Sequence, residues 1–339
     1  MISLIFSTIF YWIYFFFPNL IPLLISFSIT LFSIIIIQTN LTRNIELIDP
    51  IFKEKESTNV FGRVIPKKTR KIVLIGGHHD SNWEFPLLRK SPLFFGIMMA
   101  LPVIFNFLMI CIYLIKIIFH FLSINFLGIP LLDLILLIIL TGLMPIFLYS
   151  ILNIISNKSV MGANDNLTSI AVIIELSKYF SAHKLKNTEI WFVSHGCEEI
   201  GDRGSKRFSK KYRNELKDKG YVINIDMIGG KNTELMIDIQ EEVYLFKLCK
   251  ELGFAITKIA KKLNISHSIG SIEAFTDSLA YKQNNIKAIS LLGFPKKGFP
   301  PYYHTRFDII DNLDFNKLWN CYKIIVEFIN QIDENKIII

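Results

Sequence analysis

Three long stretches without a charged side chain constrain most strongly what this chain of 339 residues can fold into. They cover residues 1–42, 92–115 and 134–157. A helix of about 20 apolar residues crosses the ~30 Å hydrocarbon core of a bilayer, so each of the two later stretches is long enough for one span. The first stretch is interrupted by Pro18 and Pro22 and predicts a hairpin of two helices, Ile2–Phe17 and Leu20–Ile37. One span with an interfacial segment is the alternative.

The remaining residues, 43–90 and 158–339, are mixed and charged, and their length suits one α/β domain. We therefore predict a transmembrane hairpin at residues 1–40 and a second, inserted transmembrane hairpin at residues 91–155. The domain that the insertion interrupts would consist of residues 41–90 and 156–339. A cleaved signal peptide is not favoured, because no Lys or Arg precedes the first apolar stretch.

Basic residues gather where the apolar stretches meet the charged domain. They are Arg43, Lys53, Lys55, Arg63, Lys67, Lys68, Arg70, Lys71, Arg89, Lys90 and Lys158, whereas the turn at residues 119–128 has no Lys or Arg. By the positive-inside rule we expect a multi-pass integral membrane protein whose charged domain is cytoplasmic. The net charge of +8 then reflects topology and attraction to the anionic lipid of the bilayer rather than nucleic-acid binding, for which no motif is present. Lys116 and Asp133 are expected to reach the membrane interface.

Four cysteines without paired spacing predict no disulfide framework. Short apolar runs predict strands at Lys71–Ile75, Glu189–Ser194, Tyr221–Ile225 and Ile286–Leu292. Helices are predicted directly after Asn166, over Val243–Leu263 and over Phe315–Ile329. Because strands alternate with helices, we expect an α/β fold with a mostly parallel sheet and helices on both faces.

The adjacent carboxylates Glu198 and Glu199 directly follow a buried strand. Two such groups repel each other and lose solvation, so a partner must hold them. A metal centre with a water to deprotonate would do so, with one Glu as a ligand and the other as the base.

Four other positions carry ligand-type side chains: His78 with Asp80, Asp165, Asp226 and His304. Singly, each has an ordinary interpretation as a strand-end histidine, a helix N-cap, a turn residue or a loop histidine. Ligands of open α/β sheets gather at the carboxyl ends of the strands, which favours a common site. Together with Glu199 they amount to three carboxylates and two histidines, a set that suits zinc.

The order of these motifs resembles that of the M28 family of dizinc aminopeptidases. The matching segments are His78-x-Asp80, Gly162-Ala-Asn-Asp165-Asn166, Glu198-Glu199, Asp226-Met227 and Tyr303-His304, together with Phe275-Thr-Asp277-Ser, which is similar to the family's substrate-pocket segment. The resemblance covers nearly all of residues 60–90 and 158–330. It implies a zinc-exopeptidase-like fold and hydrolysis of peptides that have a free N-terminus.

The resemblance also implies a role for each residue. Asp165 would bridge two Zn²⁺ ions, which His78 with Asp226 and Glu199 with His304 would complete. Glu198 would deprotonate the bridging water, Asp80 would orient His78, Tyr303 would hydrogen-bond the oxyanion, and Asp277 would belong to the substrate pocket. In soluble members only a short segment separates the first two ligands, whereas here that segment holds both central spans. The resemblance therefore places the site close to the bilayer.

Two other functions fit the same motifs. A glutaminyl cyclase resembles this family but keeps one zinc ion and would not need His78. A non-catalytic membrane receptor of the same fold would typically have lost ligands or the base, and none is missing here. Neither the oligomeric state nor the side-chain specificity follows from the sequence.

Overall fold

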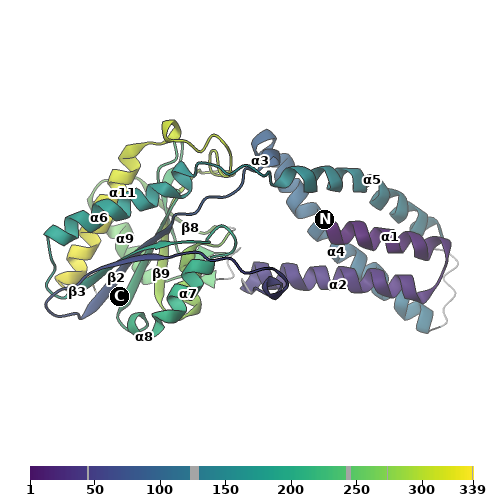
Figure 1. Ribbon diagram of the computed structural model, residues 1–339, viewed down its shortest axis with the longest axis horizontal. Helices are drawn as coiled ribbons and strands as arrows, with labels where there is room; N and C mark the ends of the chain where they lie inside the picture. Colours follow the sequence, from purple (N-terminus) through teal and green to yellow (C-terminus); the bar gives the residue numbers. More distant parts are fainter. Residues whose placement is uncertain (44–45, 123–129, 242–245, 273, 338) are drawn as a thin grey trace. The chain divides into compact units, whose positions relative to one another are not determined.

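The computed structural model describes the whole chain except residues 44–45, 123–129, 242–245, 273 and 338 (Figure 1). The chain divides into two compact units. The first, which we call the helical unit, consists of Met1–Lys53 and Glu84–Lys158. The second, the sheet unit, consists of Glu54–Trp83 and Ser159–Ile339.

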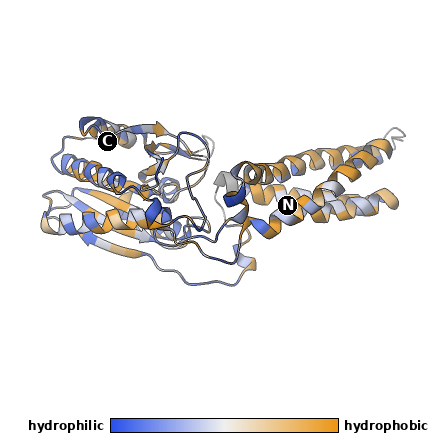
Figure 2. Ribbon diagram, turned by 90° about the horizontal axis from the view of Figure 1, so that it is seen from above, coloured by the Kyte–Doolittle hydropathy of each residue, from blue (hydrophilic) through white to orange (hydrophobic). Residues whose placement is uncertain are grey.

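The helical unit contains the apolar stretches, and its long helices are coloured mostly as hydrophobic in Figure 2. Its helices are α1 (Ile2–Phe16), α2 (Leu20–Arg43), the short α3 (Pro86–Lys90), α4 (Pro92–Phe121) and α5 (Pro130–Ile154), with a 3-10 turn at Asp49–Ile51. Three segments are long and apolar enough to cross a membrane: Leu20–Thr39, Pro92–Phe121 and Asp133–Ile154. The helices predicted in the apolar stretches are thus present, and α1 is the shorter apolar helix. Most of the predicted turn at residues 119–128 lies outside the described residues.

Lys116 and Asp133, which are expected to reach the membrane interface, contact each other. The Lys116 ammonium lies 2.6 Å from the Asp133 carboxylate, and the two side chains are only 8% and 14% exposed. The Tyr11 hydroxyl donates to the same carboxylate at 2.6 Å. Each of the two buried charges therefore has a partner of opposite sign.

The sheet unit is built on a seven-stranded sheet in the order β1-β3-β2-β4-β9-β5-β8. The strands are β1 (Val60–Val64), β2 (Lys71–His78), β3 (Thr188–His195), β4 (Gly220–Asp226), β5 (Glu234–Asp238), β8 (His267–Gly270) and β9 (Lys287–Phe294). The central strands β3, β2, β4 and β9 run parallel, whereas β1 pairs antiparallel with β3 and β5 pairs antiparallel with β9. The edge strand β8 runs parallel to β5. The predicted mostly parallel sheet is confirmed.

Helices cover both faces of this sheet, as the alternating pattern predicted. Alternate strand residues such as Val73 and Ile75 pack with α6 (Thr168–Ala182), α9 (Lys250–Lys262) and α11 (Phe315–Asp333). The intervening residues, such as Ile72 and Leu74, pack with α7 (Arg203–Lys211), α8 (Arg213–Leu216) and α10 (Asp277–Gln283). Strands buried on both faces explain the continuous apolar runs of the sequence.

One predicted element begins in the wrong place. The helix predicted over Val243–Leu263 is α9 and begins only at Lys250, after a two-stranded ribbon of β6 (Gln240–Glu241) and β7 (Phe246–Lys247). Residues 242–245 lie outside the described residues. The apolar residues before Lys250 continue the helical pattern in sequence, but tertiary packing uses Leu248 as a buried residue ahead of the helix.

Candidate metal centre

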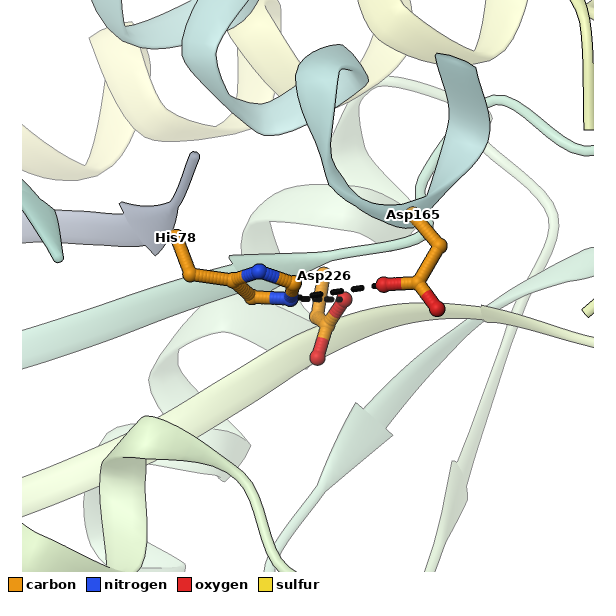
Figure 3. Close-up of side chains that lie close together, drawn as sticks. All are labelled: His78, Asp165 and Asp226. Atoms are coloured by element: carbon orange, nitrogen blue, oxygen red, sulfur yellow. Dashed lines mark ion pairs between the residues drawn. The ribbon is translucent and has the colours of Figure 1, made fainter. Parts of the chain in front are cut away.

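Two neighbouring parallel strands each end on a ligand-type side chain. His78 is the last residue of β2, and Asp226 is the last residue of β4. Because β2 and β4 pair in parallel, their carboxyl ends lie at the same edge of the sheet. The Nε2 atom of His78 lies 3.7 Å from Oδ1 of Asp226 and 3.3 Å from Oδ1 of Asp165 (Figure 3).

Asp165 reaches this edge from a tight turn, Ala163–Leu167, that immediately precedes α6. The carboxylate of Asp308 accepts the backbone N–H groups of Asn164 at 2.7 Å and Asp165 at 3.1 Å. Gly162 has φ +68°, and a Cβ there would lie 2.6 Å from the Asp165 carbonyl oxygen, so the approach to the turn requires glycine. The turn therefore holds a buried carboxylate in a fixed place.

Glu199 and His304 meet Asp165 from the opposite side. The Nε2 atom of His304 lies 3.1 Å from Asp165 Oδ2 and 3.0 Å from Glu199 Oε2. His304 itself has a backbone φ of +50°. A non-glycine residue in the left-handed region is uncommon and often marks a functional position.

Among the described residues, three groups of candidate ligands lie close together, and one of them is His78 with Glu198 and Glu199. The other two groups, which we call the two clusters, share Asp165. Ligand atoms of His78, Asp165 and Asp226 lie within 4.8 Å of one another, and so do those of Asp165, Glu199 and His304. Asp165 contributes to both clusters, with one oxygen facing each histidine. Two adjacent cations could bind here, with the Asp165 carboxylate shared between them.

Buried oxygen atoms without a hydrogen bond test whether a cation fits here. Within the part of the chain that the structure describes, Asp165 Oδ2, Glu199 Oε1 and Asp226 Oδ1 are inaccessible to solvent and make no hydrogen bond. The nearest nitrogen atoms are His304 Nε2, 3.1 Å from Asp165 Oδ2, and His78 Nε2, 3.7 Å from Asp226 Oδ1. Buried carboxylate oxygens without donors are costly unless a charge compensates them. Imidazole nitrogen and carboxylate oxygen are ligands that Zn²⁺ accepts, so the donor set fits zinc.

The electrostatics of the cluster follow from burying many charges together. Burial lowers the pKa of His78, but the carboxylates of Glu198, Asp165 and Asp226 outweigh it and raise that pKa well above its usual value. For His304, burial is likewise outweighed by Asp165 and Glu199, and its pKa rises to about 9. Burial opposes ionisation of Asp165, but its contacts with both histidines hold its pKa below the usual range. These shifts favour the ionised form of Asp165 and the protonated forms of His78 and His304.

Glu198 lies beside both clusters. One of its carboxylate oxygens is 3.7 Å from His78 Nε2, and its side chain is 12% exposed. Burial, opposed by His78 and assisted by the charges of Asp202 and Glu199, raises the pKa of Glu198 well above its usual value. A carboxylate with a raised pKa beside a cation site is suited to accept a proton.

Asp80 contacts this centre differently from the expected pairing with His78. Its carboxylate lies 3.7 Å from His78 Nδ1, beyond hydrogen-bond distance, and the Asp80 backbone oxygen takes that contact at 3.1 Å. The carboxylate instead accepts the backbone N–H groups of Glu198 at 3.1 Å and Glu199 at 3.3 Å. Asp80 therefore holds the turn that carries the two glutamates, and a carbonyl orients the imidazole.

Tyr303 and Asp277 lie at different depths. Tyr303 lines the cavity, stacks on His304 with ring centroids 3.7 Å apart, and keeps its proton because burial and the carboxylates of Asp165 and Glu199 raise its pKa. Asp277 is 1% exposed and is not among the cavity-lining residues, in contrast to the expected place in the substrate pocket. It is the first residue of α10, and the Thr276 side chain caps that helix by accepting the Ser278 backbone N–H.

Two residues that support the candidate ligands were not predicted from the sequence. Asn82 donates through Nδ2 to Glu199 Oε2 at 2.8 Å, and Asp308 holds the Asp165 turn. Asp308 lies four residues after His304, so the Tyr303-His304 motif was a usable signal for its neighbourhood. Asn82 stands two residues after Asp80 with no pattern that distinguishes it from a loop residue.

A cavity of about 550 Å³ opens onto the candidate ligands. His78, Asp165, Glu198, Glu199 and Asp226 are among its lining residues. Most of the other lining residues, which we call the apolar wall, are apolar: Met227, Ile272, Ala274, Phe275, Leu292, Phe294, Phe299 and Pro300, with Ser271 and Thr276. A ligand that bound here would place a polar group on the metal centre and an apolar group against this wall.

Comparison with known proteins agrees with the fold and the motifs. The sequence matches peptidase family M28 over residues 150–329, which is more than half of the chain. The chain therefore belongs to peptidase family M28. The matched segment contains Asp165, Glu198, Glu199, Asp226 and His304, whereas His78 precedes it.

Individual relatives show how far the similarity extends. The chain is 26% identical over 182 residues to a probable leucine aminopeptidase of Trichophyton verrucosum, covering 50% of this chain and 46% of that protein. The chain spans between about a quarter and a half of the length of the curated relatives that it matches.

Solved structures share the fold. A zinc aminopeptidase from Bacillus subtilis aligns with a TM-score of 0.51 and 17% identity, over 80% of this chain and 49% of that one. A glutaminyl cyclase from Porphyromonas gingivalis aligns with a TM-score of 0.52 and 16% identity, over 80% and 77%. At these identities the similarity concerns the fold alone.

Proposed function

We propose that this protein is a membrane-anchored aminopeptidase that uses two zinc ions. The observation that carries the proposal is the sharing of Asp165 between two ligand clusters, one with His78 and Asp226 and the other with Glu199 and His304. Membership of peptidase family M28 and the aminopeptidase names of several relatives support the same activity.

The two zinc ions would be held by these five side chains. Zinc supplies a lowered pKa for water and polarisation of a scissile carbonyl. The neighbouring carboxylates Asp165, Glu199 and Asp226 compensate that positive charge, and the buried oxygens without hydrogen bonds gain partners.

Glu198 and Tyr303 supply the remaining chemistry. Glu198 takes a proton from the attacking water and delivers it to the leaving amine, since its carboxylate lies beside both clusters. The protonated Tyr303 hydroxyl, on the cavity wall, donates a hydrogen bond to the oxygen of the attacked carbonyl as negative charge develops.

The substrate would be a peptide with a free N-terminus and an apolar first side chain. The apolar wall of the cavity accommodates that side chain by burying it without charge compensation. The carboxylates that also line the cavity attract the N-terminal ammonium group. The relative named a probable leucine aminopeptidase agrees with this preference.

Membrane anchoring would come from the helical unit. Helices α2, α4 and α5 have the length and composition of spans, and α1 completes the hairpin at residues 1–40. The inserted hairpin at residues 91–155 then separates the two parts of the peptidase domain, 41–90 and 156–339. The basic residues that flank the spans favour a cytoplasmic domain. A reporter fused to the C-terminus tests the side, and an external reporter would contradict it.

Metal analysis and an aminoacyl reporter panel test the activity together. We expect the detergent-purified protein to bind two zinc ions and to release N-terminal leucine. The variant Glu198→Gln should retain both ions and lose about 10²–10⁴-fold in turnover, since it removes only the base. Full activity of this variant would show that Glu198 is not the base.

The metal count also separates the aminopeptidase from a glutaminyl cyclase. A cyclase-like enzyme would bind one zinc ion, would not depend on His78 and would cyclise N-terminal glutamine. The position of His78, 3.3 Å from Asp165 and 3.7 Å from Asp226, favours two ions. One ion together with cyclisation would reverse the assignment.

A further inference from the structure

A buried acidic residue, Glu241, contacts Thr276, which lines the cavity. Glu241, in β6, is completely buried and belongs to none of the ligand clusters. Its Oε1 atom lies 2.5 Å from Oγ1 of Thr276, and its Oε2 atom accepts the Thr276 backbone N–H at 3.5 Å. Thr276 itself lines the cavity and caps α10.

Thr276 begins a chain of hydroxyl groups that ends on a backbone oxygen. Its Oγ1 lies 2.7 Å from Ser290 Oγ, and Ser290 Oγ donates to Ser278 Oγ at 2.8 Å. Ser278 Oγ donates to the Ile289 carbonyl oxygen at 2.8 Å. All three hydroxyl side chains are buried.

The directions of these hydrogen bonds bear on the protonation state of Glu241. A hydroxyl carries one proton and donates once. With the Ser278 proton on Ile289 and the Ser290 proton on Ser278, the Thr276 proton serves either Ser290 or Glu241. We assign it to Ser290, so that Glu241, as a neutral carboxylic acid, supplies the proton of its own contact with Thr276.

The surroundings of Glu241 agree with a neutral acid. Burial raises the pKa of Glu241 well above its usual value, and the proximity of Asp238, whose own pKa is raised, further disfavours a charge on both carboxyl groups. A neutral acid offers Thr276 both an O–H donor and a carbonyl acceptor, which matches the two contacts. It also adds no charge behind the apolar part of the cavity.

A second hydrogen bond joins β6 to a residue that lines the cavity. The Ile272 backbone N–H donates to the Gln240 carbonyl at 3.2 Å, directly before Glu241. Ile272, Phe275 and Thr276 line the cavity but belong to no helix or strand except at the start of α10. Their position therefore depends on the contacts with residues 240 and 241.

We infer that Glu241 is a positioning residue that, as a neutral acid, holds Thr276 and the adjoining cavity wall and thereby sets which first side chain the enzyme accepts. This inference rests on the proposed aminopeptidase function. Glu241 touches neither the substrate nor the candidate metal ligands, so its removal should alter recognition more than turnover.

Steady-state kinetics on reporters with Ala, Val, Leu or Phe as the first residue test this inference. The variant Glu241→Ala should raise KM for Leu and Phe about tenfold, the equivalent of one buried hydrogen bond, with a smaller change for Ala and an unchanged kcat. Glu241→Gln should resemble the wild type, because its amide offers the same donor and acceptor. Glu215→Ala removes an exposed carboxylate and serves as the control.

Thr276→Val tests the same contact from the cavity side. Because it nearly preserves shape and removes the hydroxyl, it should reproduce the KM pattern of Glu241→Ala. Thr276→Val also removes the helix cap and the Ser290 contact, so the double variant should be no worse than Thr276→Val alone, which already lacks the contact with Glu241. An equal loss of kcat on every reporter, additive effects, or failure of Glu241→Gln to replace Glu241 would overturn the inference.

Hydrogen exchange gives a readout that does not depend on activity. The amides of Ile272 and Thr276 should exchange faster in Glu241→Ala than in wild type or Glu241→Gln. Unchanged exchange would overturn the role of Glu241 even in an active enzyme. A wild-type protein that cleaves no aminoacyl reporter would instead refute the proposed function, while the exchange measurement would still decide on Glu241.

Discussion

The two units bury polar groups in different ways. In the helical unit, Lys116 pairs with Asp133, and the Ser7 hydroxyl contacts Tyr113 and Thr30 at 2.7 and 3.0 Å. In the sheet unit, the buried carboxylates of Asp165, Glu199 and Asp226 keep oxygen atoms without hydrogen bonds. Paired polar groups stabilise a helix bundle, whereas buried carboxylates without hydrogen bonds can bind a cation. The helical unit also holds a buried oxygen atom without a hydrogen bond, Asn106 Oδ1, so the difference lies in the clustering of charged groups, which the sheet unit has at the candidate metal centre.

The largest effect is expected from Asp165→Asn. The bridging carboxylate would lose its charge at both cation positions, so we expect both zinc ions to bind too weakly for purification and turnover to fall by more than about 10⁴-fold. Metal analysis and the leucine reporter measure this. His304→Ala should remove one ion and leave the other. Retention of two ions in Asp165→Asn would refute the shared ligand.

A large loss of stability is expected from Lys116→Met. It leaves Asp133 without its cation inside the helical unit, which should cost about 3–5 kcal/mol. The double variant Lys116→Met/Asp133→Leu should recover most of this, because neither charge remains. Thermal unfolding in detergent measures the change, and Lys258→Met on the exposed face of α9 is the control. If the double variant were as unstable as Lys116→Met, the uncompensated charge of Asp133 would not be the cause of the loss.

A smaller effect is expected from Asn82→Ala. It removes the hydrogen bond to Glu199 but no ligand, so zinc affinity should fall about 10–100-fold with the count of ions preserved at high zinc. Competition with a chelator measures the affinity. If the affinity were unchanged, the unsatisfied cluster would not depend on its neighbours for orientation.

A further effect concerns the pH dependence of stability. Burial raises the pKa of Asp238 to about 8, above its usual 3.8. The folded state therefore holds a proton that the unfolded state releases, and stability falls between about pH 4 and 8, by up to ~1.4 kcal/mol per pH unit. Asp238→Asn should flatten this slope. Unfolding measured at pH 6 and 8 tests it, and an unchanged slope would exclude Asp238 as its source.

Much of the sheet unit was predictable because its strands are buried on both faces. The runs at residues 71–75, 189–194 and 221–225 could be read as strands from their apolar residues alone, and their ends placed His78 and Asp226 at one edge. The start of α9 could not be read, since the apolar residues ahead of Lys250 suit either a helix or a packed ribbon. Asn82 could not be found either, because its role depends on a contact across 117 residues of sequence.

The sequence by itself determined the apolar spans, the order of the motifs and the ligand types, because these depend on residue chemistry and local spacing. Only the tertiary structure decided which atoms meet. It brought His78 and Asp165 together across the insertion, moved the Asp80 carboxylate from His78 to the glutamate turn and joined Lys116 to Asp133. Such contacts depend on the positions of distant backbone segments, and those positions are set by packing of the whole unit rather than by any local pattern.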